Sequence, residues 1–128
     1  MKNCKVCIVT GASRGLGRGI ALVLARDEGC RVYATARNGD ALKALVEEAA
    51  TGTKGGTVNA CVLDQSDDAA VQAFVEQVKK KESQVDLLVN SAYAGLIAIK
   101  PHFGKSFWEK PLSVFDASLN IGLRSAYV

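Results

Sequence analysis

The stretch VTGASRGLGRG, Val9 to Gly19, decides the fold, because it places four glycines and two arginines directly after an apolar run. A glycine-rich turn between a strand and a helix lets backbone amides approach a phosphate at the positive end of the helix. The spacing does not fit G-x-G-x-x-G, since Ile20 takes the sixth place, and no Gly-Lys-Ser or Gly-Lys-Thr of a P-loop occurs within it. The stretch therefore predicts either a pyrophosphate-binding loop or a plain tight turn.

Short apolar runs alternate with segments of helical period along the whole chain. The runs are rich in Val, Ile and Leu and predict strands over 5–10, 31–36, 57–63 and 85–90. Strand, helix, strand, repeated, implies right-handed crossovers and a parallel sheet. We expect one α/β domain over 1–128, a Rossmann-type doubly wound sheet with helices on both faces, ending after about four strands and the start of a fourth large helix. The stripes that predict the helices are Leu16, Ile20, Val23 and Leu24; Leu42, Leu45, Val46 and Ala49; Val71, Phe74, Val75 and Val78; and, after Pro111, Phe115, Leu119, Leu123 and Tyr127.

Composition excludes several classes of partner. A net charge of +3 with 6% aromatic residues gives little support to nucleic-acid binding. No apolar run is long enough for a signal-peptide core or a membrane span, so a cytoplasmic protein is expected. Cys4 and Cys7 form a C-x-x-C, but no second pair follows and His102 is the only histidine, so we expect no metal site and keep a redox pair as the minor alternative.

Four features in the same order resemble the short-chain dehydrogenase/reductase family. The first is T-G-x-x-x-G-x-G at Thr10, Gly11, Gly15 and Gly17, and the second is Asp64 after the third apolar run, which otherwise caps the next helix. The third is NSAYAG, 90–95, similar to the family's Asn-Asn-Ala-Gly, although Ser91 replaces an asparagine and Tyr93 and Ala94 are extra. The fourth is Asn120, similar to the asparagine that organises the family's catalytic residues. The cofactor-binding residues that the resemblance implies are Thr10, Gly11, Ser13, Arg14, Gly15, Leu16, Gly17, Arg37, Asp64, Asn90, Ala92 and Gly95.

The expected cofactor is NADP(H) rather than NAD(H). A carboxylate at the end of the second strand accepts hydrogen bonds from a ribose 2′-hydroxyl and repels a 2′-phosphate, whereas this chain has Ala36 and Arg37 there. Arg37 and Arg14 place two guanidinium groups beside the same expected pocket, which suits bidentate recognition of a phosphate. The alternative is that both arginines are ordinary surface charges.

The residues that carry the family's chemistry are absent from this sequence. The resemblance implies hydride transfer between a nicotinamide and a small carbonyl or alcohol substrate, with a serine and a Tyr-x-x-x-Lys pair after Asn120. Tyr33 is followed four residues later by Arg37 and Tyr93 by Ile97, and the sequence ends after Tyr127. We therefore expect the cofactor half of an oxidoreductase, inactive alone. The competing class is a non-catalytic nucleotide-binding or interaction protein.

Further expectations concern partners and the segment after NSAYAG. Tyr93, His102 and Trp108 either line a substrate pocket near the nicotinamide or pack against the sheet or a partner subunit. The resemblance also implies a possible homo-oligomer. The segments NSAYAG, KSFWEKP and LNIGLRSAY indicate one particular subgroup of the family, which does not fix a substrate.

Overall fold

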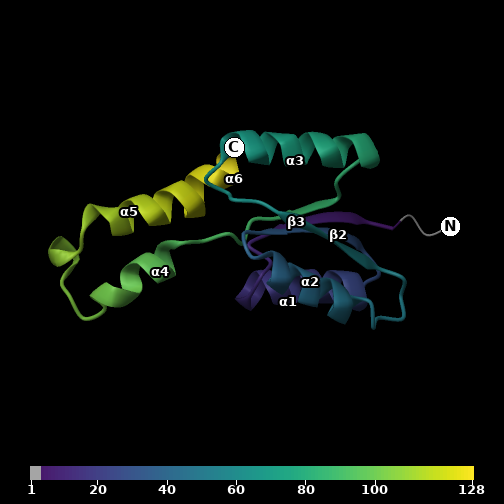
Figure 1. Cartoon of the computed structure of the whole chain (residues 1–128), viewed down its shortest axis with the longest axis horizontal. Coiled ribbons are helices and arrows are strands. Elements are labelled where there is room, and N and C mark those ends of the chain that lie inside the picture. Colours follow the sequence, from purple (N-terminus) through teal and green to yellow (C-terminus); the bar gives the residue numbers. More distant parts are fainter. Residues whose placement is uncertain (1–3) are drawn as a thin grey trace.

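Four parallel strands form the centre of the molecule in a computed structural model that describes residues 4–128 (Figure 1). β1 (Val6–Thr10), β2 (Arg31–Ala36), β3 (Thr57–Val62) and β4 (Leu87–Val89) lie in the order β3-β2-β1-β4. Ile8 pairs with Tyr33 on one side and with Leu88 on the other. The expected parallel sheet is confirmed, and its fourth strand is shorter than the sequence predicts.

Helices cover both faces of the sheet, as a doubly wound fold requires (Figure 1). α1 (Gly15–Arg26) and α2 (Gly39–Ala49) lie on one face, and α3 (Asp68–Lys81) lies on the other. Alternate residues of β1 serve the two layers, because successive side chains of a strand point to opposite faces. Cys7 and Val9 pack with α1 and α2. Val6 and Ile8 pack with Phe74 and its neighbours on α3.

The buried face of α1 differs from the predicted stripe. Leu16, Ile20 and Val23 are exposed, and Leu24 is only partly buried. The residues that face the sheet are mostly small ones, which allow the helix to approach the strands closely: Gly17, Ala21, Leu22 and Ala25. The prediction of a helix is confirmed, but its predicted inner face is wrong. Close packing against the strands favours small residues on this face, with Leu22 as the one large side chain among them.

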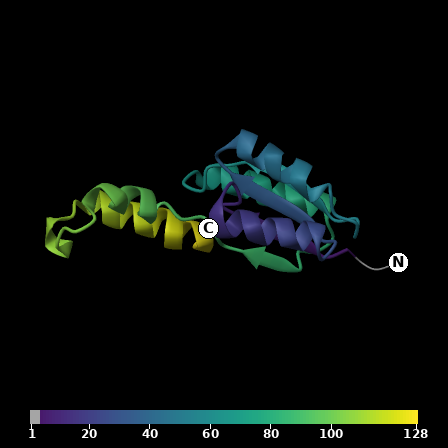
Figure 2. The same ribbon diagram turned by 90° about the horizontal axis from the view of Figure 1, so that it is seen from below.

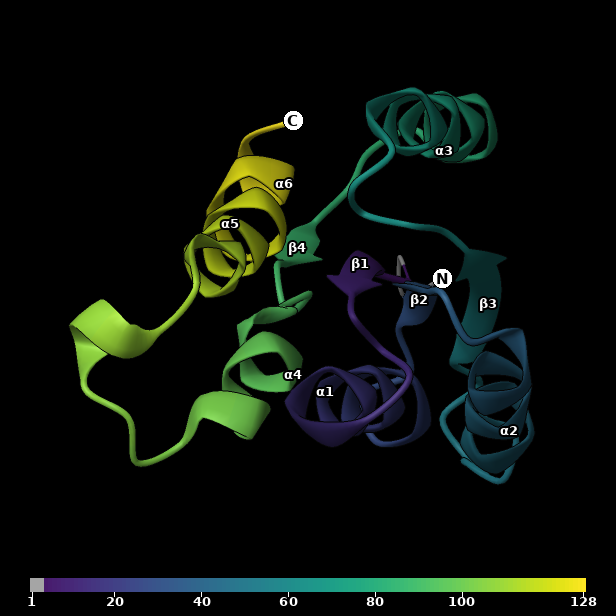
Figure 3. The same cartoon turned by 60° about the vertical axis from the view of Figure 1, so that its left-hand side comes forward.

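The last third of the chain forms a helical arm that extends away from the sheet (Figures 1 and 2). Its main parts are α4 (Gly95–Ile99) and α5 (Leu112–Leu119), which lie side by side in Figure 3. Between them lie two short 3₁₀ turns, Lys100–His102 and Phe107–Glu109. After α5 the chain widens into a π-helical turn, Asn120–Arg124, and ends in α6, Ser125–Tyr127. Arg124 donates to both carboxylate oxygens of Asp68 at 2.7 and 2.6 Å, which joins the arm to α3.

The helix predicted after Pro111 is confirmed, and its apolar stripe is exposed. Phe115, Leu119, Leu123 and Tyr127 are all exposed, and the buried residues of the segment are Val114 and Ser125. A π-helical turn holds more residues than an α-helical one, so Tyr127, which follows it, no longer shares a regular helical period with Phe115 and Leu119. Among residues 4–128, no helix combines the length and the apolar character that a membrane crossing needs.

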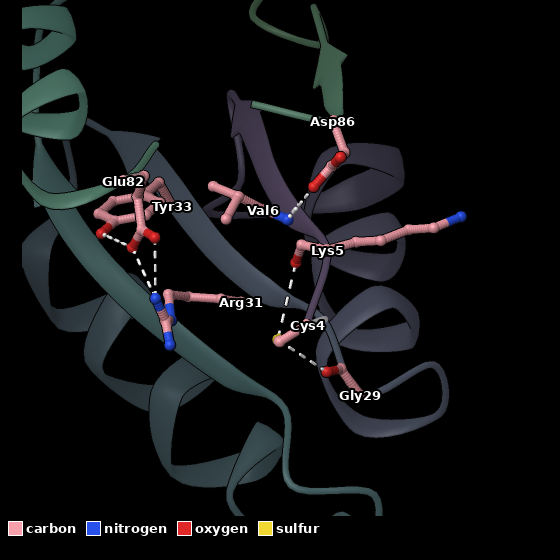
Figure 4. A network of polar contacts seen from close by, with 8 residues as sticks. All are labelled: Cys4, Lys5, Val6, Gly29, Arg31, Tyr33, Glu82 and Asp86. Atoms are coloured by element: carbon pink, nitrogen blue, oxygen red, sulfur yellow. Dashed lines mark hydrogen bonds and ion pairs between the residues drawn. The ribbon is translucent and has the colours of Figure 1, made fainter. Parts of the chain in front are cut away.

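A polar cluster fastens the amino edge of the sheet (Figure 4). Tyr33 Oη donates to Glu82 at 2.7 Å, and Arg31 Nη1 donates to both oxygens of the same carboxylate at 2.9 and 2.8 Å. These hydrogen bonds, first from Tyr33 and then from Arg31, hold the pKa of Glu82 below its ordinary value. Burial, followed by the bond to Glu82, raises the pKa of Tyr33 to about 12. Asp86 Oδ2 accepts from the amide of Val6 at 2.7 Å, which ties β1 to the start of β4.

Candidate functional site

A hollow of about 920 Å³ lies at the carboxyl ends of the strands, where parallel α/β sheets bind their ligands. We call it the carboxyl-edge hollow. Residues from the segments that follow all four strands contribute to its wall, so chain positions far apart in the sequence meet there. The sequence-predicted residues that line it are Gly11, Ser13, Arg14, Gly15, Leu16, Gly17, Arg37, Asp64 and Ala92.

The glycine loop is shaped by close backbone approaches. Gly11 has φ +64°, and a Cβ there would come within 2.8 Å of Ser91 O. A Cβ at Gly17 would lie 2.3 Å from Gly11 O. Both positions therefore exclude a side chain on packing grounds alone. Gly15 differs, because its φ is +59° but nothing lies within 4 Å of a Cβ built there. The turn is thus packed on its inner side and open where it lines the hollow.

The amino end of α1 fits a negatively charged group. Arg14 is its N-cap residue and makes no side-chain capping hydrogen bond, and the first turn contains no acidic residue. The first backbone N–H groups of a helix have no partners within the helix, and its dipole places partial positive charge at this end. Because Gly15 adds no side chain in front of them, a phosphate has room to approach.

Thr10 connects two of the loops that form the hollow. Its Oγ1 accepts hydrogen bonds from the amides of Ser91 at 3.1 Å and Ala92 at 3.2 Å. The residue is only 6% exposed and lies beneath the hollow instead of in its wall. The structure thus shows a positioning role for Thr10, and direct contact with a cofactor stays a prediction.

Asp64 forms a local turn after β3. Its Oδ1 accepts from the amide of Ser66 at 2.9 Å and from Ser66 Oγ at 2.7 Å. These two bonds, with a smaller contribution from the charge of Arg37, hold the pKa of Asp64 below its ordinary value. The alternative reading of Asp64 as a helix cap is wrong, because Asp67 caps α3 by accepting from the amide of Ala70. Asp64 is left exposed at the hollow with a carboxylate that stays ionised.

Arg14 and Arg37 both line the hollow, from the loops after β1 and β2. Ala36 also lines it and ends β2 without a carboxylate. Because β2 and β3 are neighbours in the sheet, Arg37 after β2 and Asp64 after β3 line the same side of the hollow. Their role toward a ligand stays a prediction.

Besides Thr10, three more predicted residues lie outside the wall of the hollow. Asn90 is exposed after β4, and Gly95 is buried at the start of α4. Asn120 is exposed and opens the π-helical turn, while its neighbour Ile121 lines the hollow. The cofactor and catalytic roles of these three residues stay predictions.

The structure also adds residues to the site that the sequence did not indicate. Tyr93, within NSAYAG, lines the hollow, whereas His102 and Trp108 do not. Wall residues next to the expected motifs could be predicted from their position in the sequence, but nothing in the sequence indicated Lys100 or Ile121. The wall residues absent from the predicted set are Leu63, Gln65, Ser91, Ala94, Leu96, Ile97, Lys100, Pro101 and Ile121.

Comparisons with known proteins agree with this geometry. The family model described as short chain dehydrogenase matches residues 5–127. A mouse protein named dehydrogenase/reductase SDR family member 1 is 46% identical over 125 residues, which cover 97% of this chain and 39% of the relative. A metagenomic short-chain oxidoreductase in complex with NADP is 33% identical, with a TM-score of 0.80 over 96% of this chain and 52% of that one. An alcohol dehydrogenase from the archaeon Thermococcus sibiricus, complexed with 5-hydroxy-NADP, is 30% identical, with a TM-score of 0.81 over 98% of this chain and 49% of that one.

The segments NSAYAG, KSFWEKP and LNIGLRSAY indicate the dehydrogenase/reductase SDR family member 1 subgroup, and the similarity to the mouse protein of that name confirms this expectation. The chain spans about two-fifths of this curated relative, by the 39% share.

Proposed function

The chain belongs to the short-chain dehydrogenase family, and from this premise we propose that it binds NADP(H) in the carboxyl-edge hollow as the cofactor-binding part of an oxidoreductase. The observation that carries the proposal is the uncapped amino end of α1, which opens beside Gly15 into the hollow that Arg14 and Arg37 line. The positive end of the α1 dipole, its first backbone amides and two arginine residues thus adjoin the same hollow. A dinucleotide with an extra phosphate has the charge that this arrangement stabilises.

The preference for NADP(H) over NAD(H) rests on the end of β2. Ala36 offers no carboxylate to a 2′-hydroxyl, and Arg37 brings positive charge to the side of the hollow where Asp64 lies. Asp64 would accept a hydrogen bond from the adenine amine. Two of the similar solved structures hold an NADP-type ligand, which supports the proposal by analogy.

The proposed reaction is hydride transfer between a nicotinamide and a small carbonyl or alcohol substrate. The bound cofactor would supply or accept the hydride, and the residues of this chain would bind and orient it. Asn120 is the one residue of the family's catalytic group to which this sequence offers a match. Because the sequence has no Tyr-x-x-x-Lys pair, we expect these 128 residues to bind NADPH without turning over a substrate.

We also propose that the protein resides in a reducing compartment such as the cytosol. The four cysteines, Cys4, Cys7, Cys30 and Cys61, are all free thiols in the structure. Free thiols persist where glutathione and thioredoxin keep cysteines reduced. The partners proposed are the dinucleotide and a small-molecule substrate, with a second copy of the chain as the further expectation from the resemblance.

Dissociation constants for NADPH and NADH test the proposal directly. We expect the unmodified chain to bind NADPH about tenfold more tightly or better, and Arg37→Gln to remove most of that difference. Arg26→Gln is the matched control, because Arg26 pairs with Asp27 at the far end of α1. Equal affinities for both cofactors in the unmodified chain would overturn the NADP(H) preference, and no binding of either would overturn the function. Oxidation of NADPH with a broad carbonyl panel would contradict the expected inactivity.

A further inference from the structure

Two glycines from different parts of the helical arm make room for the side chain of Tyr93. A Cβ at Gly95 would lie 2.1 Å from Tyr93 Oη, and a Cβ at Gly122 would lie 2.9 Å from its Cδ2 and 3.1 Å from its Cε2. The hydroxyl therefore rests at the start of α4, and one edge of the ring rests on the π-helical turn. No side chain larger than hydrogen fits at either glycine while Tyr93 keeps this place.

A hydrogen-bonded serine fixes the hydroxyl end of the ring. Tyr93 Oη and Ser118 Oγ lie 3.4 Å apart, and Ser118 Oγ donates its proton to Val114 O at 2.9 Å. Because the serine proton is already used, Tyr93 is the donor of the pair. The ring is thus held at its edge and at its hydroxyl, while 52% of the residue stays exposed. Tyr93 lines the carboxyl-edge hollow.

The place of Tyr93 in the hollow identifies which part of a dinucleotide it meets. Asp64 follows β3 and Arg37 follows β2, whereas Tyr93 follows β4, the strand at the opposite edge of the sheet. Three strand spacings of about 4.8 Å separate β3 from β4, so the hollow extends over roughly 14 Å. With the phosphates at the amino end of α1, beside the central strand β1, the adenosine lies toward β3 and the nicotinamide riboside lies toward β4.

We propose that Tyr93 is a positioning residue for the nicotinamide riboside half of the cofactor, which its clamped ring contacts from the β4 side. The inference rests on the proposed function. Aromatic contact suits a planar pyridine ring, and a ring already fixed by Gly95, Gly122 and Ser118 loses little freedom when the ligand arrives.

Comparison of a whole and a half ligand tests the assignment. NADPH contains the nicotinamide riboside, and 2′,5′-ADP contains only the adenosine end with its extra phosphate. We expect Tyr93→Ala to weaken NADPH binding about fivefold and to change 2′,5′-ADP binding less than about twofold. Tyr93→Phe keeps the ring and should bind NADPH within about twofold of the unmodified chain. Gly122→Ala, which displaces the ring edge, should reproduce the NADPH loss.

The control and the spectroscopic readout separate positioning from folding. Tyr127→Ala removes an equally aromatic side chain that is 93% exposed and does not line the hollow, so it should change neither affinity. The fluorescence of bound NADPH reports the surroundings of the reduced nicotinamide and should fall in Tyr93→Ala at saturation. If Tyr93→Ala fails to fold, Tyr93→Leu and Gly122→Ala carry the same comparison.

The two proposals fail in different ways. If the unmodified chain binds neither NADPH nor 2′,5′-ADP, the proposed function is wrong and the role of Tyr93 falls with it. If the chain binds both ligands and Tyr93→Ala weakens both equally or neither, the function stands and the role of Tyr93 is wrong. A selective loss of NADPH affinity that Tyr93→Phe restores supports the inference.

Discussion

Removal of the Glu82 carboxylate at the amino edge of the sheet should destabilise the chain and should change the effect of removing the Tyr33 hydroxyl. The Glu82 side chain is only 8% exposed and accepts hydrogen bonds from both Tyr33 and Arg31 (Figure 4). Glu82→Ala leaves the Tyr33 hydroxyl without its partner in a residue that is 5% exposed. A buried polar group without a partner destabilises the folded state by about 1–3 kcal/mol.

The magnitude follows from the exposure of each partner. Arg31 is 45% exposed at its side chain, so water replaces much of what it loses and the ion pair contributes about 0.5 kcal/mol. The orphaned Tyr33 hydroxyl carries the larger share, and we expect about 2 kcal/mol in total for Glu82→Ala. Tyr33→Phe alone removes one hydrogen bond and should lower the free energy of unfolding by about 1 kcal/mol.

The double variant gives the sharpest test. In the Glu82→Ala background the Tyr33 hydroxyl is already buried without a partner, so Tyr33→Phe removes that unpaired group and should raise the free energy of unfolding by about 1 kcal/mol. The free energy of unfolding is measured by urea denaturation followed by far-ultraviolet circular dichroism, with an unchanged m-value as the control for a comparable transition. If Tyr33→Phe destabilises both backgrounds equally, the hydrogen bond between these two side chains does not carry the stability assigned to it.

Three further predictions concern the glycine loop, a buried phenol and a helix cap. Gly17→Ala should destabilise the chain by about 2 kcal/mol through the clash of its Cβ with Gly11 O, whereas Gly19→Ala, with open space around it in the same helix, should stabilise by about 0.5 kcal/mol in thermal denaturation. The pKa of Tyr33 is raised from 10.0 to about 12, so this residue should ionise at higher pH than ordinary tyrosines in an absorbance titration. Because the raised pKa belongs to the folded state, the stabilisation is complete below pH 10 and is lost as the pH rises toward 12. Ionisation of all tyrosines together near pH 10 would contradict this prediction. Asp67→Ala should cost about 1 kcal/mol by removing the cap of α3, and an unchanged denaturation midpoint would show that the bond to the Ala70 amide contributes nothing.

Much of the sheet and its loops follows from local sequence rules. The run at 31–36 is a strand over those residues, because its Val, Tyr and Thr side chains favour an extended backbone that is buried on both faces. The glycine loop was predictable because turns with positive φ and close backbone contacts admit few other residues, as Gly11 shows. The placing of Asp64 and Arg37 at one hollow also followed, since parallel strands bring their carboxyl ends to one edge.

The rest depended on packing that no local pattern reports. The inner face of α1 consists mostly of small residues, because the helix lies close to the strands, whereas Leu16, Ile20 and Val23 lie on its outer face. The π-helical turn at Asn120–Arg124 changes which side of the arm later residues occupy, and the spacing of apolar residues does not predict this turn. Lys100 and Ile121 line the hollow because of the path of the arm, which the local sequence does not predict.

The hydrogen bonds of Thr10 link the two ends of the hollow. One hydroxyl oxygen holds the amides of Ser91 and Ala92, directly before Tyr93, and the same residue leads into the glycine loop at Gly11. The glycine loop and the segment after β4 are therefore held together by one side chain, which sets the distance between the two ends of the hollow. A molecule that reaches only one end of the hollow lacks the contacts at the other end, so the hollow favours ligands of one length without a moving lid.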